Sequence, residues 1–275
     1  MKIQLLGTSA APTWPDVFNR GNDYCYKIKE WKGKNIRSRS QTIINDEHVI
    51  DFGLDTFYHS VKFNINFANI RDIFITHSHV DHFNKEQLGF IDQVCFGRSF
   101  KYPYITLYGN EEVIKQSKLY RRSEEDLKLV EVHAYEPVVC EDGFKWTPIP
   151  ANHIPNENAL NYIIEHNGKT LLYKVDSGPY TDPKLWDFLS KFKFDCIITE
   201  GTFNFRKTPF AGHEIYDTIL DMKKRLIEMG CIEDKTPFWL THIHYFEGGL
   251  SHEEAEEITS KDNIHIGYDG AVINI

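Results

Sequence analysis

Thr76-His77-Ser78-His79-Val80-Asp81-His82 is the stretch that decides the fold of this chain of 275 residues. It overlaps the end of the apolar run IRDIFIT (70–76), which predicts a buried strand that ends in this loop. Three histidines and one aspartate stand within six residues. Imidazole and carboxylate are the side chains that bind divalent metal ions at neutral pH without thiolates. A single histidine here would indicate an ordinary surface or core residue, but this density of donors after a buried strand predicts a metal site.

The spacing within the loop divides the donors into two sets. Side chains alternate along an extended segment, so His77 and His79 face the same side and can bind one ion. Asp81 and His82 follow after the chain turns and can reach a second ion a few ångströms away. The loop therefore predicts a centre for two metal ions.

The composition excludes several classes of protein. Apolar residues make up 41% of the chain and charged residues 26%, which is ordinary for a globular protein and excludes a disordered or collagen-like one. Forty acidic against 31 basic residues leave a formal net charge of −9, the opposite of what a protein that grips long nucleic acid usually carries. No apolar run approaches the roughly 18 residues that span a bilayer. The N-terminal MKIQLLGTSAAP lacks the apolar core of a signal peptide, so we expect a cytoplasmic protein without membrane contact.

The five cysteines indicate neither a disulfide framework nor a zinc site built on cysteine pairs. They are odd in number, widely spaced and without a C-x-x-C pair. Cys95 and Cys196 stand in apolar runs, so we expect them to be small buried hydrophobic residues.

The chain is expected to form one domain over residues 1–275, because no linker, repeat or low-complexity segment divides it. Strand-like runs bounded by turn residues lie at 2–7, 23–28, 41–45, 48–53, 70–76, 104–109, 127–133, 160–166 and 169–176. Helical patterns lie at 110–122, 184–192, 213–230 and 252–261. Many short strands with interspersed helices predict an α/β (α+β layered) protein in which two sheets are sandwiched between helices.

The histidine loop, with HVIDFG (48–53) upstream, resembles the metallo-β-lactamase superfamily, whose fold is an αββα sandwich with its metals at one edge between the sheets. The resemblance implies further ligands in a fixed order along the chain. It assigns His153 to the first ion, Asp176 to both ions as a shared carboxylate, and His242 to the second ion. It also implies that Asp51 steadies the histidine loop from behind the ligands.

Each of these positions has an ordinary alternative when it is taken alone. His153 can be a loop histidine, and Asp176 can be a turn former before Ser-Gly-Pro. His242 or His244 can be a core histidine at a strand end. Their order along the chain, and their positions after strand-like runs, favour the interpretation as metal ligands.

Further motifs are similar to the phosphodiesterase branch of the superfamily, which holds RNase Z-type tRNA 3′-processing endonucleases and PhnP-like cyclic-phosphate phosphodiesterases. They are Leu6-Gly7-Thr8-Ser9, Arg37-Ser38-Arg39-Ser40-Gln41-Thr42, Thr199-Glu200-Gly201-Thr202-Phe203, Gly212-His213-Glu214 and Leu240-Thr241-His242-Ile243. In that branch the histidine matching His213 contacts the phosphate or protonates the leaving group, and the acid matching Glu200 polarises it. We expect His213, Glu200 and Asp81 to be the catalytic residues. The alternative for His213 is an ordinary residue at a helix N-terminus.

The chain departs from the cyclic-phosphate members at a cysteine cluster that often precedes the Arg-Ser segment and holds a structural zinc. Only Cys25 stands there, and His244 does not reproduce the spacing of the histidine that goes with that cluster. We therefore expect no third, structural metal site. Arg39 and Ser40 are candidate phosphate contacts, and the alternative is an arginine that is merely solvated.

The resemblance implies a hydrolase with two divalent ions per chain, Zn²⁺ or Mn²⁺, with Fe²⁺ also compatible with such ligands. Two such ions, less the charges of Asp81, Asp176 and a bridging hydroxide, leave a positive pocket in a negative protein. Such a pocket favours a small anion. We therefore expect a phosphodiesterase that cleaves a small cyclic phosphate or short phosphodiester by attack of the metal-bridging hydroxide.

Three other functions remain open. A tRNA 3′-processing endonuclease uses a protruding basic arm between the ligands that match His153 and Asp176, but only 22 residues separate them here. A lactonase or thioesterase would use the same metals, and the pairing of Glu200 with His213 argues against it by resemblance. A metal-binding member of the fold without turnover is disfavoured because every ligand type is present. The sequence leaves the oligomeric state open, a homodimer included.

Overall fold

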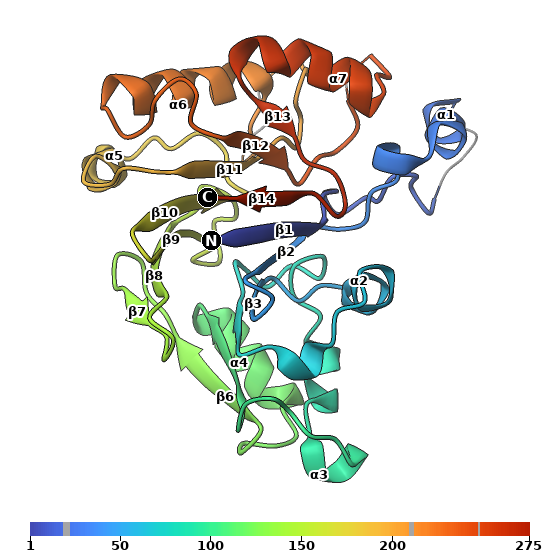
Figure 1. Ribbon diagram of the computed structural model, residues 1–275, viewed down its shortest axis with the longest axis vertical. Coiled ribbons are helices and arrows are strands. Elements are labelled where there is room, and N and C mark those ends of the chain that lie inside the picture. The colour runs from blue at the N-terminus through green and yellow to red at the C-terminus, as the bar shows by residue number, and fades with distance from the viewer. Residues whose placement is uncertain (19–22, 209–211, 247) are drawn as a thin grey trace.

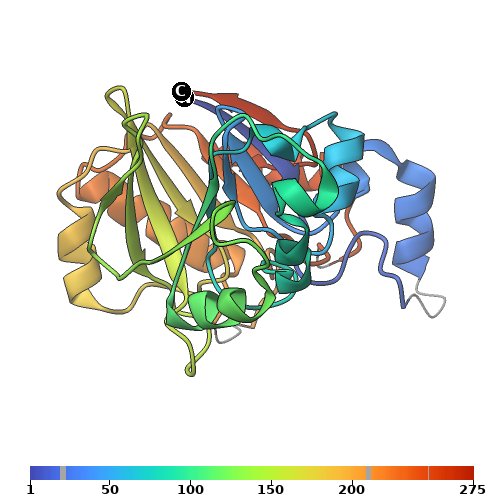
Figure 2. The same cartoon turned by 90° about the horizontal axis from the view of Figure 1, so that it is seen from below.

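The computed structural model describes residues 1–18, 23–208, 212–246 and 248–275, and these form two seven-stranded sheets that pack face to face. Across the first sheet the strands are, in order, β14 (Val272–Asn274), β1 (Lys2–Gly7), β2 (Gln41–Ile44), β3 (His48–Ile50), β4 (Asp72–Phe74), β5 (Ile105–Gly109) and β6 (Leu127–Glu131). Across the second they are β13 (His265–Ile266), β12 (Phe238–Thr241), β11 (Cys196–Glu200), β10 (Lys169–Lys174), β9 (Leu160–His166), β8 (Lys145–Pro150) and β7 (Val138–Val139). Figure 2 shows the two chain ends side by side, where the Met1 ammonium donates to the Ile275 carbonyl over 2.7 Å.

Helices cover the outer faces of both sheets, which completes the predicted αββα order of layers (Figure 1). The helices are α1 (Asp23–Trp31), α2 (Thr56–Lys62), α3 (Gln93–Phe96), α4 (Glu111–Tyr120), α5 (Pro183–Leu189), α6 (Tyr216–Glu228) and α7 (His252–Thr259). Trp186 of α5 and Leu226 of α6 belong to the core on the second sheet. Val113 of α4 belongs to the core on the first. Within the described ranges we find no helix with both the length and the apolar character that crossing a membrane requires.

The strands of the second sheet are apolar on both faces because both faces are covered. In β11, Ile197 belongs to the core beneath the helices and Ile198 to the core between the sheets. In β10, Leu172 belongs to the core beneath the helices and Leu171 to the core between the sheets. Continuous apolar runs of this kind are typical of strands buried on two sides. Between the sheets, the rings of Phe74 and Trp146 stack at 3.7 Å between centroids, so the layers are in direct contact near the histidine loop.

The direction of the strands brings their following loops to one edge of the sandwich. β3 to β6 run parallel to one another, and so do β10 to β13. Leu160 N donates to the Thr76 carbonyl over 2.9 Å, and Ile243 N donates to the Thr8 carbonyl over 2.8 Å. These bonds link the first sheet to the second where β4 and β12 end. Loops that are distant in sequence therefore meet there.

A buried arginine holds the N-terminal strand against the C-terminal part of the chain. Arg37 donates to Thr8 Oγ1 over 2.8 Å and to His252 Nδ1 over 2.9 Å. Burial lowers the pKa of Arg37 to about 10, so the group stays charged at neutral pH. Asp269 accepts from Thr8 Oγ1 at 2.9 Å and from Ser38 Oγ at 2.6 Å. The first half of the Arg-Ser segment is therefore part of the framework.

The strand predicted at 23–28 is wrong, because Asp23–Trp31 forms helix α1. Cys25 and Ile28 are buried three residues apart, and Tyr24 and Trp31 pack on the same core. Side chains at this spacing lie on one face of a helix. The run at 23–28 is too short to show this period, so its aromatic residues favoured a strand. The helix predicted at 213–230 begins at Tyr216, so the residues before it lie in a loop.

One further expectation differs from the structure, and one strand was not expected. Cys196 is buried as predicted, but Cys95 is exposed. Cys95 lies on the short helix α3, where the neighbouring Val94 is also exposed and where Arg122 Nη1 donates to the sulfur over 3.1 Å. Strand β8 escaped prediction because it carries Pro148, a residue that usually argues against a strand interior.

Candidate metal centre

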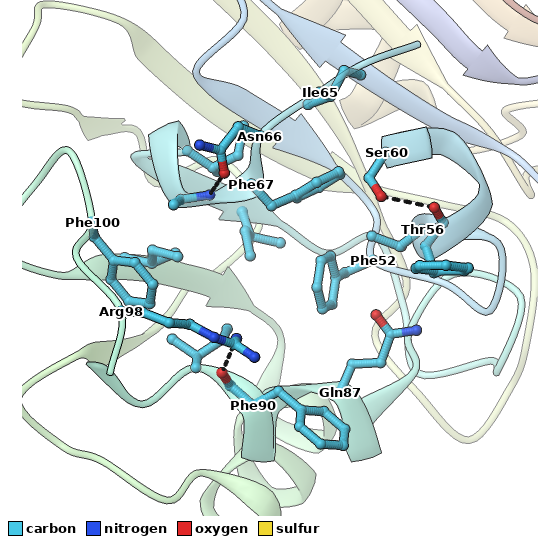
Figure 3. A pocket seen from close by; sticks show the side chains of 16 residues that line it. Phe52, Thr56, Ser60, Ile65, Asn66, Phe67, Gln87, Phe90, Arg98 and Phe100 are labelled. Atoms are coloured by element: carbon cyan, nitrogen blue, oxygen red, sulfur yellow. Dashed lines mark hydrogen bonds between the residues drawn. The ribbon is translucent and has the colours of Figure 1, made fainter. Parts of the chain in front are cut away.

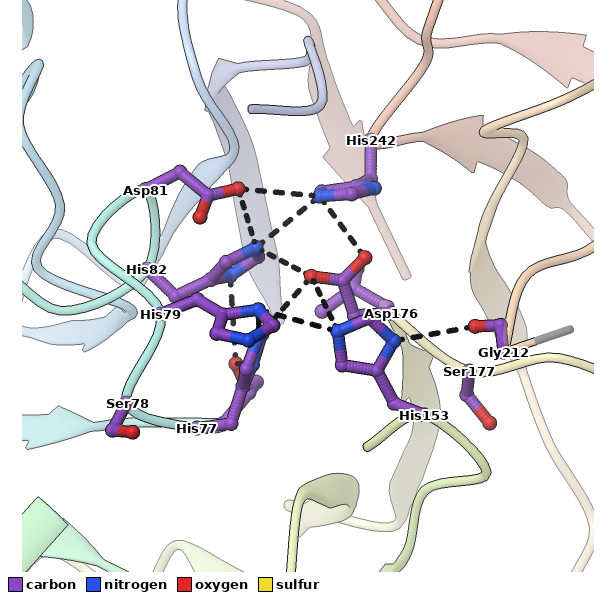
Figure 4. Close-up of polar contacts among 12 residues, drawn as sticks. His77, Ser78, His79, Asp81, His82, His153, Asp176, Ser177, Gly212 and His242 are labelled. Atoms are coloured by element: carbon purple, nitrogen blue, oxygen red, sulfur yellow. Dashed lines mark hydrogen bonds and ion pairs between the residues drawn. The ribbon is translucent and has the colours of Figure 1, made fainter. Parts of the chain in front are cut away.

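The seven predicted ligands meet at the edge where the loops converge, and they form two groups that share one residue (Figure 4). One group is His77, His79, His153 and Asp176; the other is Asp81, His82, Asp176 and His242. Within each group the donor atoms lie within 4.8 Å of one another. The arrangement matches the predicted division into a first site, a second site and a shared carboxylate. That these residues bind metal stays a prediction.

The first group is held by contacts between ring nitrogens. His77 Nε2 lies 2.9 Å from His79 Nδ1, and His153 Nε2 lies 3.3 Å from the same atom. Asp176 Oδ2 lies 3.3 Å from His77 Nε2. His79 is exposed whereas His77 is buried, so the cluster opens to the surface on the side of His79.

The second group is buried. His82 Nε2 lies 2.8 Å from Asp176 Oδ2 and 3.2 Å from His242 Nε2. Asp81 Oδ2 lies 3.3 Å from His82 Nε2 and 3.8 Å from His242 Nε2. All four donor atoms therefore point into a common space.

Strained backbone places three of the site residues. Asp51 has φ of 66°, Asp176 of 44° and His242 of 51°, and each follows the end of a strand within two residues. A left-handed conformation costs roughly 1–2 kcal/mol per residue for amino acids other than glycine. Such a cost at three neighbouring turns is typical of functional sites, where the surrounding structure sustains the conformation.

Asp51 contacts the histidine loop from behind the ligand groups, at the place that the resemblance implied. Its Oδ1 accepts from Thr76 N at 2.8 Å and from Thr76 Oγ1 at 2.9 Å. Its Oδ2 accepts from His82 Nδ1 at 2.6 Å. This contact orients the ring so that Nε2 faces Asp176. Burial opposes protonation of His82, but Asp81 and Asp51 outweigh it and hold the pKa of the imidazole well above its usual value, so a metal ion would have to displace the proton on Nε2.

The donors present fit a pair of divalent cations. Asp176 Oδ1 is buried and makes no hydrogen bond within the described chain, although His242 Nε2 lies 3.3 Å away. Burial lowers the pKa of His77 well below its usual value, so its imidazole is neutral and can donate a lone pair. Burial opposes the charge on Asp176, but His242 and His82 outweigh it and hold the pKa of this carboxyl well below its usual range. A set of imidazoles and carboxylates without sulfur suits Zn²⁺, Mn²⁺ or Fe²⁺.

His213 and Glu200 form a pair beside the shared carboxylate. His213 Nδ1 lies 2.9 Å from Glu200 Oε2 and 3.5 Å from Asp176 Oδ1. Burial opposes protonation of His213, but Glu200 outweighs burial and raises the pKa of the imidazole. Glu200 is fully buried, and its Oε1 accepts from Ser177 N at 3.2 Å and from Glu214 N at 2.9 Å. The pair is therefore held in place by hydrogen bonds at the border of the cluster.

Two residues that support the site were missing from the predicted set. Thr202 Oγ1 donates to Glu200 and lies 2.9 Å from His242 Nδ1, so one hydroxyl links the pair of His213 and Glu200 to the second group. Glu157 accepts from Ser78 N at 2.8 Å and holds the histidine loop. Neither residue carries a sequence signal for this role, because the contact depends on loops that only the fold brings together.

Arg39, Ser40 and His244 lie outside both ligand groups. Arg39 Nη1 pairs with Asp55 Oδ1 at 3.1 Å, and Ser40 is buried. Burial lowers the pKa of His244, and its ring lies 5.6 Å from that of Phe203. Contact of Arg39 and Ser40 with a substrate stays a prediction.

A cavity of about 610 Å³ is lined chiefly by apolar residues such as Phe52, Phe67, Phe90 and Phe100 (Figure 3). None of the predicted ligands lines it. Among the described residues that line this cavity there is no cluster of metal donors.

Residues 49–230, which are more than half of the chain, match the family described as the beta-lactamase superfamily domain. The chain belongs to the metallo-β-lactamase superfamily. The predicted family and fold class are thereby confirmed. A comparison with curated protein sequences gave no match.

Solved structures of other metallo-β-lactamase fold proteins are similar over the whole chain. A diphosphatase from the PhnP family has 18% identity and a TM-score of 0.71, covering 100% of this chain and 97% of its own. Zn²⁺-bound PqqB from Methylobacterium extorquens has 14% identity and a TM-score of 0.72, covering 100% of both chains. The short form of human tRNase Z has 17% identity and a TM-score of 0.62, covering 100% of this chain and 99% of its own. Likeness at such low identity establishes a shared fold.

The substitution Asp51→Asn should weaken metal binding by about 10–100-fold, because it replaces the charged acceptor of His82 Nδ1 with a neutral amide. Asparagine tolerates the left-handed backbone, so the turn itself should survive. Competition with a chromophoric chelator for Zn²⁺ measures the effect. Asp55→Asn is the matched control, since Asp55 pairs with Arg39 and should leave the metal affinity unchanged. Equal affinities for the wild type and Asp51→Asn would contradict the assigned role.

Proposed function

We propose that this metallo-β-lactamase chain is a dinuclear metal-dependent phosphodiesterase that cleaves a small cyclic phosphate or a short phosphodiester. The observation that carries the proposal is the position of His213, whose Nδ1 lies 3.5 Å from the shared carboxylate Asp176. A proton donor there stands next to the atoms that would hold both ions. The names of two structural relatives, a diphosphatase from the PhnP family and a tRNase Z, agree with chemistry at phosphate groups.

The charges of the site suit an anionic substrate. Asp81 and Asp176 supply two negative charges, so two divalent ions would leave the pocket positive within a chain of net charge −9. When bound, such ions would supply an activated water and neutralise the phosphoryl oxygens. The opening beside the exposed His79 gives a small anion access to the ligand groups.

The role of His213 is to give a proton to the departing oxygen of the ester. Glu200 accepts the hydrogen bond from His213 Nδ1 and thereby stabilises the imidazolium. The proton on the other ring nitrogen, Nε2, can then pass to the alkoxide that leaves. General acid catalysis of this kind contributes about 10²–10⁴-fold to the rate.

The chain between His153 and Asp176 favours a small substrate over tRNA. Of the 22 residues between these ligands, Leu160–His166 and Lys169–Lys174 form the paired strands β9 and β10. A protruding basic arm would have to come from the few residues that remain. The net charge of −9 opposes long-range attraction of a polyanion as well.

Protein reloaded with Mn²⁺ or Zn²⁺ should hydrolyse bis(p-nitrophenyl) phosphate and a 2′,3′-cyclic nucleotide. Asp176→Asn is the control, because it removes the shared charge with little change in volume and should abolish turnover. Release of p-nitrophenolate and chromatography of the nucleotide measure the two reactions. Hydrolysis of a lactone or thioester with both phosphodiesters intact would contradict the proposal, as would faster cleavage of a tRNA precursor than of either small ester.

The substitution His213→Gln should affect substrates according to their leaving groups. Turnover of the cyclic nucleotide, which releases a poor alkoxide leaving group, should fall by about 10²–10⁴-fold. Turnover of bis(p-nitrophenyl) phosphate should change much less, since p-nitrophenolate leaves without a proton. His244→Gln, a nearby histidine outside the ligand groups, is the matched control.

Metal content separates catalysis from ligation in this experiment. His213→Gln should retain as many bound ions as the wild type. Loss of metal, or an equal fall in the rates of both substrates, would contradict the assignment of His213 as the general acid.

A further inference from the structure

A third cluster of metal-type donors lies where strands of the first sheet begin, at the end of those strands away from the histidine loop. His48 is the first residue of β3, Asp72 is the first residue of β4, and Cys140 directly follows β7. Their donor atoms lie within 4.8 Å of one another, and all three residues are buried. The proposed phosphodiesterase reaction makes no use of them.

Two atoms of the cluster are near one another without being hydrogen-bonded. His48 Nδ1 lies 3.1 Å from Asp72 Oδ2. Both atoms are buried, and neither makes a hydrogen bond within the described residues. An ordinary ion pair aligns an N–H with the carboxylate oxygen, so that the buried atoms are satisfied. Cys140 is hydrogen-bonded to Asp72 and to Tyr108. A buried nitrogen and a buried oxygen that lie side by side without a hydrogen bond between them are what a pair of ligands presents to a cation.

The other nitrogen of His48 is oriented by a second carboxylate. His48 Nε2 donates to Asp142 Oδ2 over 2.8 Å. This contact fixes the proton on Nε2 and turns the lone pair of Nδ1 towards Asp72 and Cys140. Histidines that bind metal commonly donate their other N–H to a carboxylate in this way.

A cavity gives an ion access to the cluster, and the charged residues around the cluster favour a cation. A cavity of about 340 Å³ is lined by Asp72, Tyr108, Cys140 and Glu141, and it provides an entry path. Asp72, Asp142 and Glu141 bring three negative charges, against two positive charges from Arg71, which pairs with Glu141 Oε2 at 3.1 Å, and from Lys128, which lines the same cavity. A net negative charge therefore remains for a cation to neutralise.

We propose that His48, Asp72 and Cys140 form a structural zinc site, distinct from the centre at the other edge. Imidazole, carboxylate and thiolate together suit Zn²⁺, and water from the cavity can complete four ligands. Binding releases the thiol proton of Cys140 to solvent, so the sulfur joins the ion as a thiolate. Because burial, reinforced by Asp72, raises the pKa of this thiol, uptake should strengthen as the pH rises.

The bound ion would connect the two sheets beside the short edge strand of the second sheet. His48 and Asp72 belong to the first sheet, whereas Cys140 lies in the turn between β7 and β8 of the second. β7 has two residues and forms the edge of its sheet. A metal clamp there would hold this hairpin against β3 and β4. This proposal departs from the expectation of no structural metal site, which rested on spacing motifs that residues so far apart in sequence do not form.

Cobalt spectroscopy distinguishes the two centres, since the predicted ligands of the main centre include no cysteine. Reduced, metal-free protein titrated with Co²⁺ should develop a thiolate-to-cobalt charge-transfer band in the near ultraviolet. Cys140→Ser should lose the band and one bound ion per chain. Cys196→Ser, another buried cysteine, is the matched control and should retain both. Asp176→Asn should also keep the band, because it alters only the other centre.

The proposal is overturned if the wild type binds cobalt to saturation without the band, or if the band persists in Cys140→Ser. His48→Gln is the second variant, should Cys140→Ser fail to fold, and it keeps the thiol while removing an imidazole ligand. An unchanged band and an unchanged number of bound ions in His48→Gln would equally contradict the site. None of these readouts depends on phosphodiesterase activity.

Discussion

The contact of one buried carboxylate, Asp176, with histidines of the histidine loop and of the loop after β12 is the constraint on which the rest of the site depends. His82 and His242 lie 2.8 Å and 3.3 Å from its oxygens, and His77 lies 3.3 Å away. A buried charge is costly unless it is compensated, and here the compensation comes entirely from loops of other strands. The position of Asp176 therefore couples both ligand groups to each other. The same carboxylate lies 3.5 Å from His213 Nδ1, so the pair of His213 and Glu200 is coupled to both ligand groups as well.

The fold meets this constraint by ending parallel strands at one edge and by turning the chain sharply there. Asp51, Asp176 and His242 all adopt left-handed backbone, and none of them is a glycine. The strain is sustained by the hydrogen bonds to Asp51 and by the covered cores on both sides of each sheet. The site is thus enclosed by packed residues on its buried side, while the exposed His79 leaves the other side open to solvent.

The sequence could predict those parts of the molecule that depend on local pattern. The histidine loop places four metal-type side chains within six residues, so the spacing alone predicts a metal site there, whereas the predictions of His153, Asp176 and His242 required the resemblance to a family. The helix at Asp23–Trp31, the proline-containing strand β8 and the supporting role of Thr202 were missed. In each case tertiary contacts decide the outcome against the local signal. The cluster of His48, Asp72 and Cys140 escaped for the same reason, since only the pairing of strands brings it together.

The most direct test of the account is the number of ions that the main centre binds. Native mass spectrometry of Zn²⁺-loaded Cys140→Ser, which lacks a ligand of the third cluster, should detect two ions per chain. In that background His153→Gln should lose one ion, because His153 belongs to a single group, and Asp176→Asn should lose both. Two ions that remain bound with unchanged affinity in Asp176→Asn would contradict the claim that this carboxylate is shared.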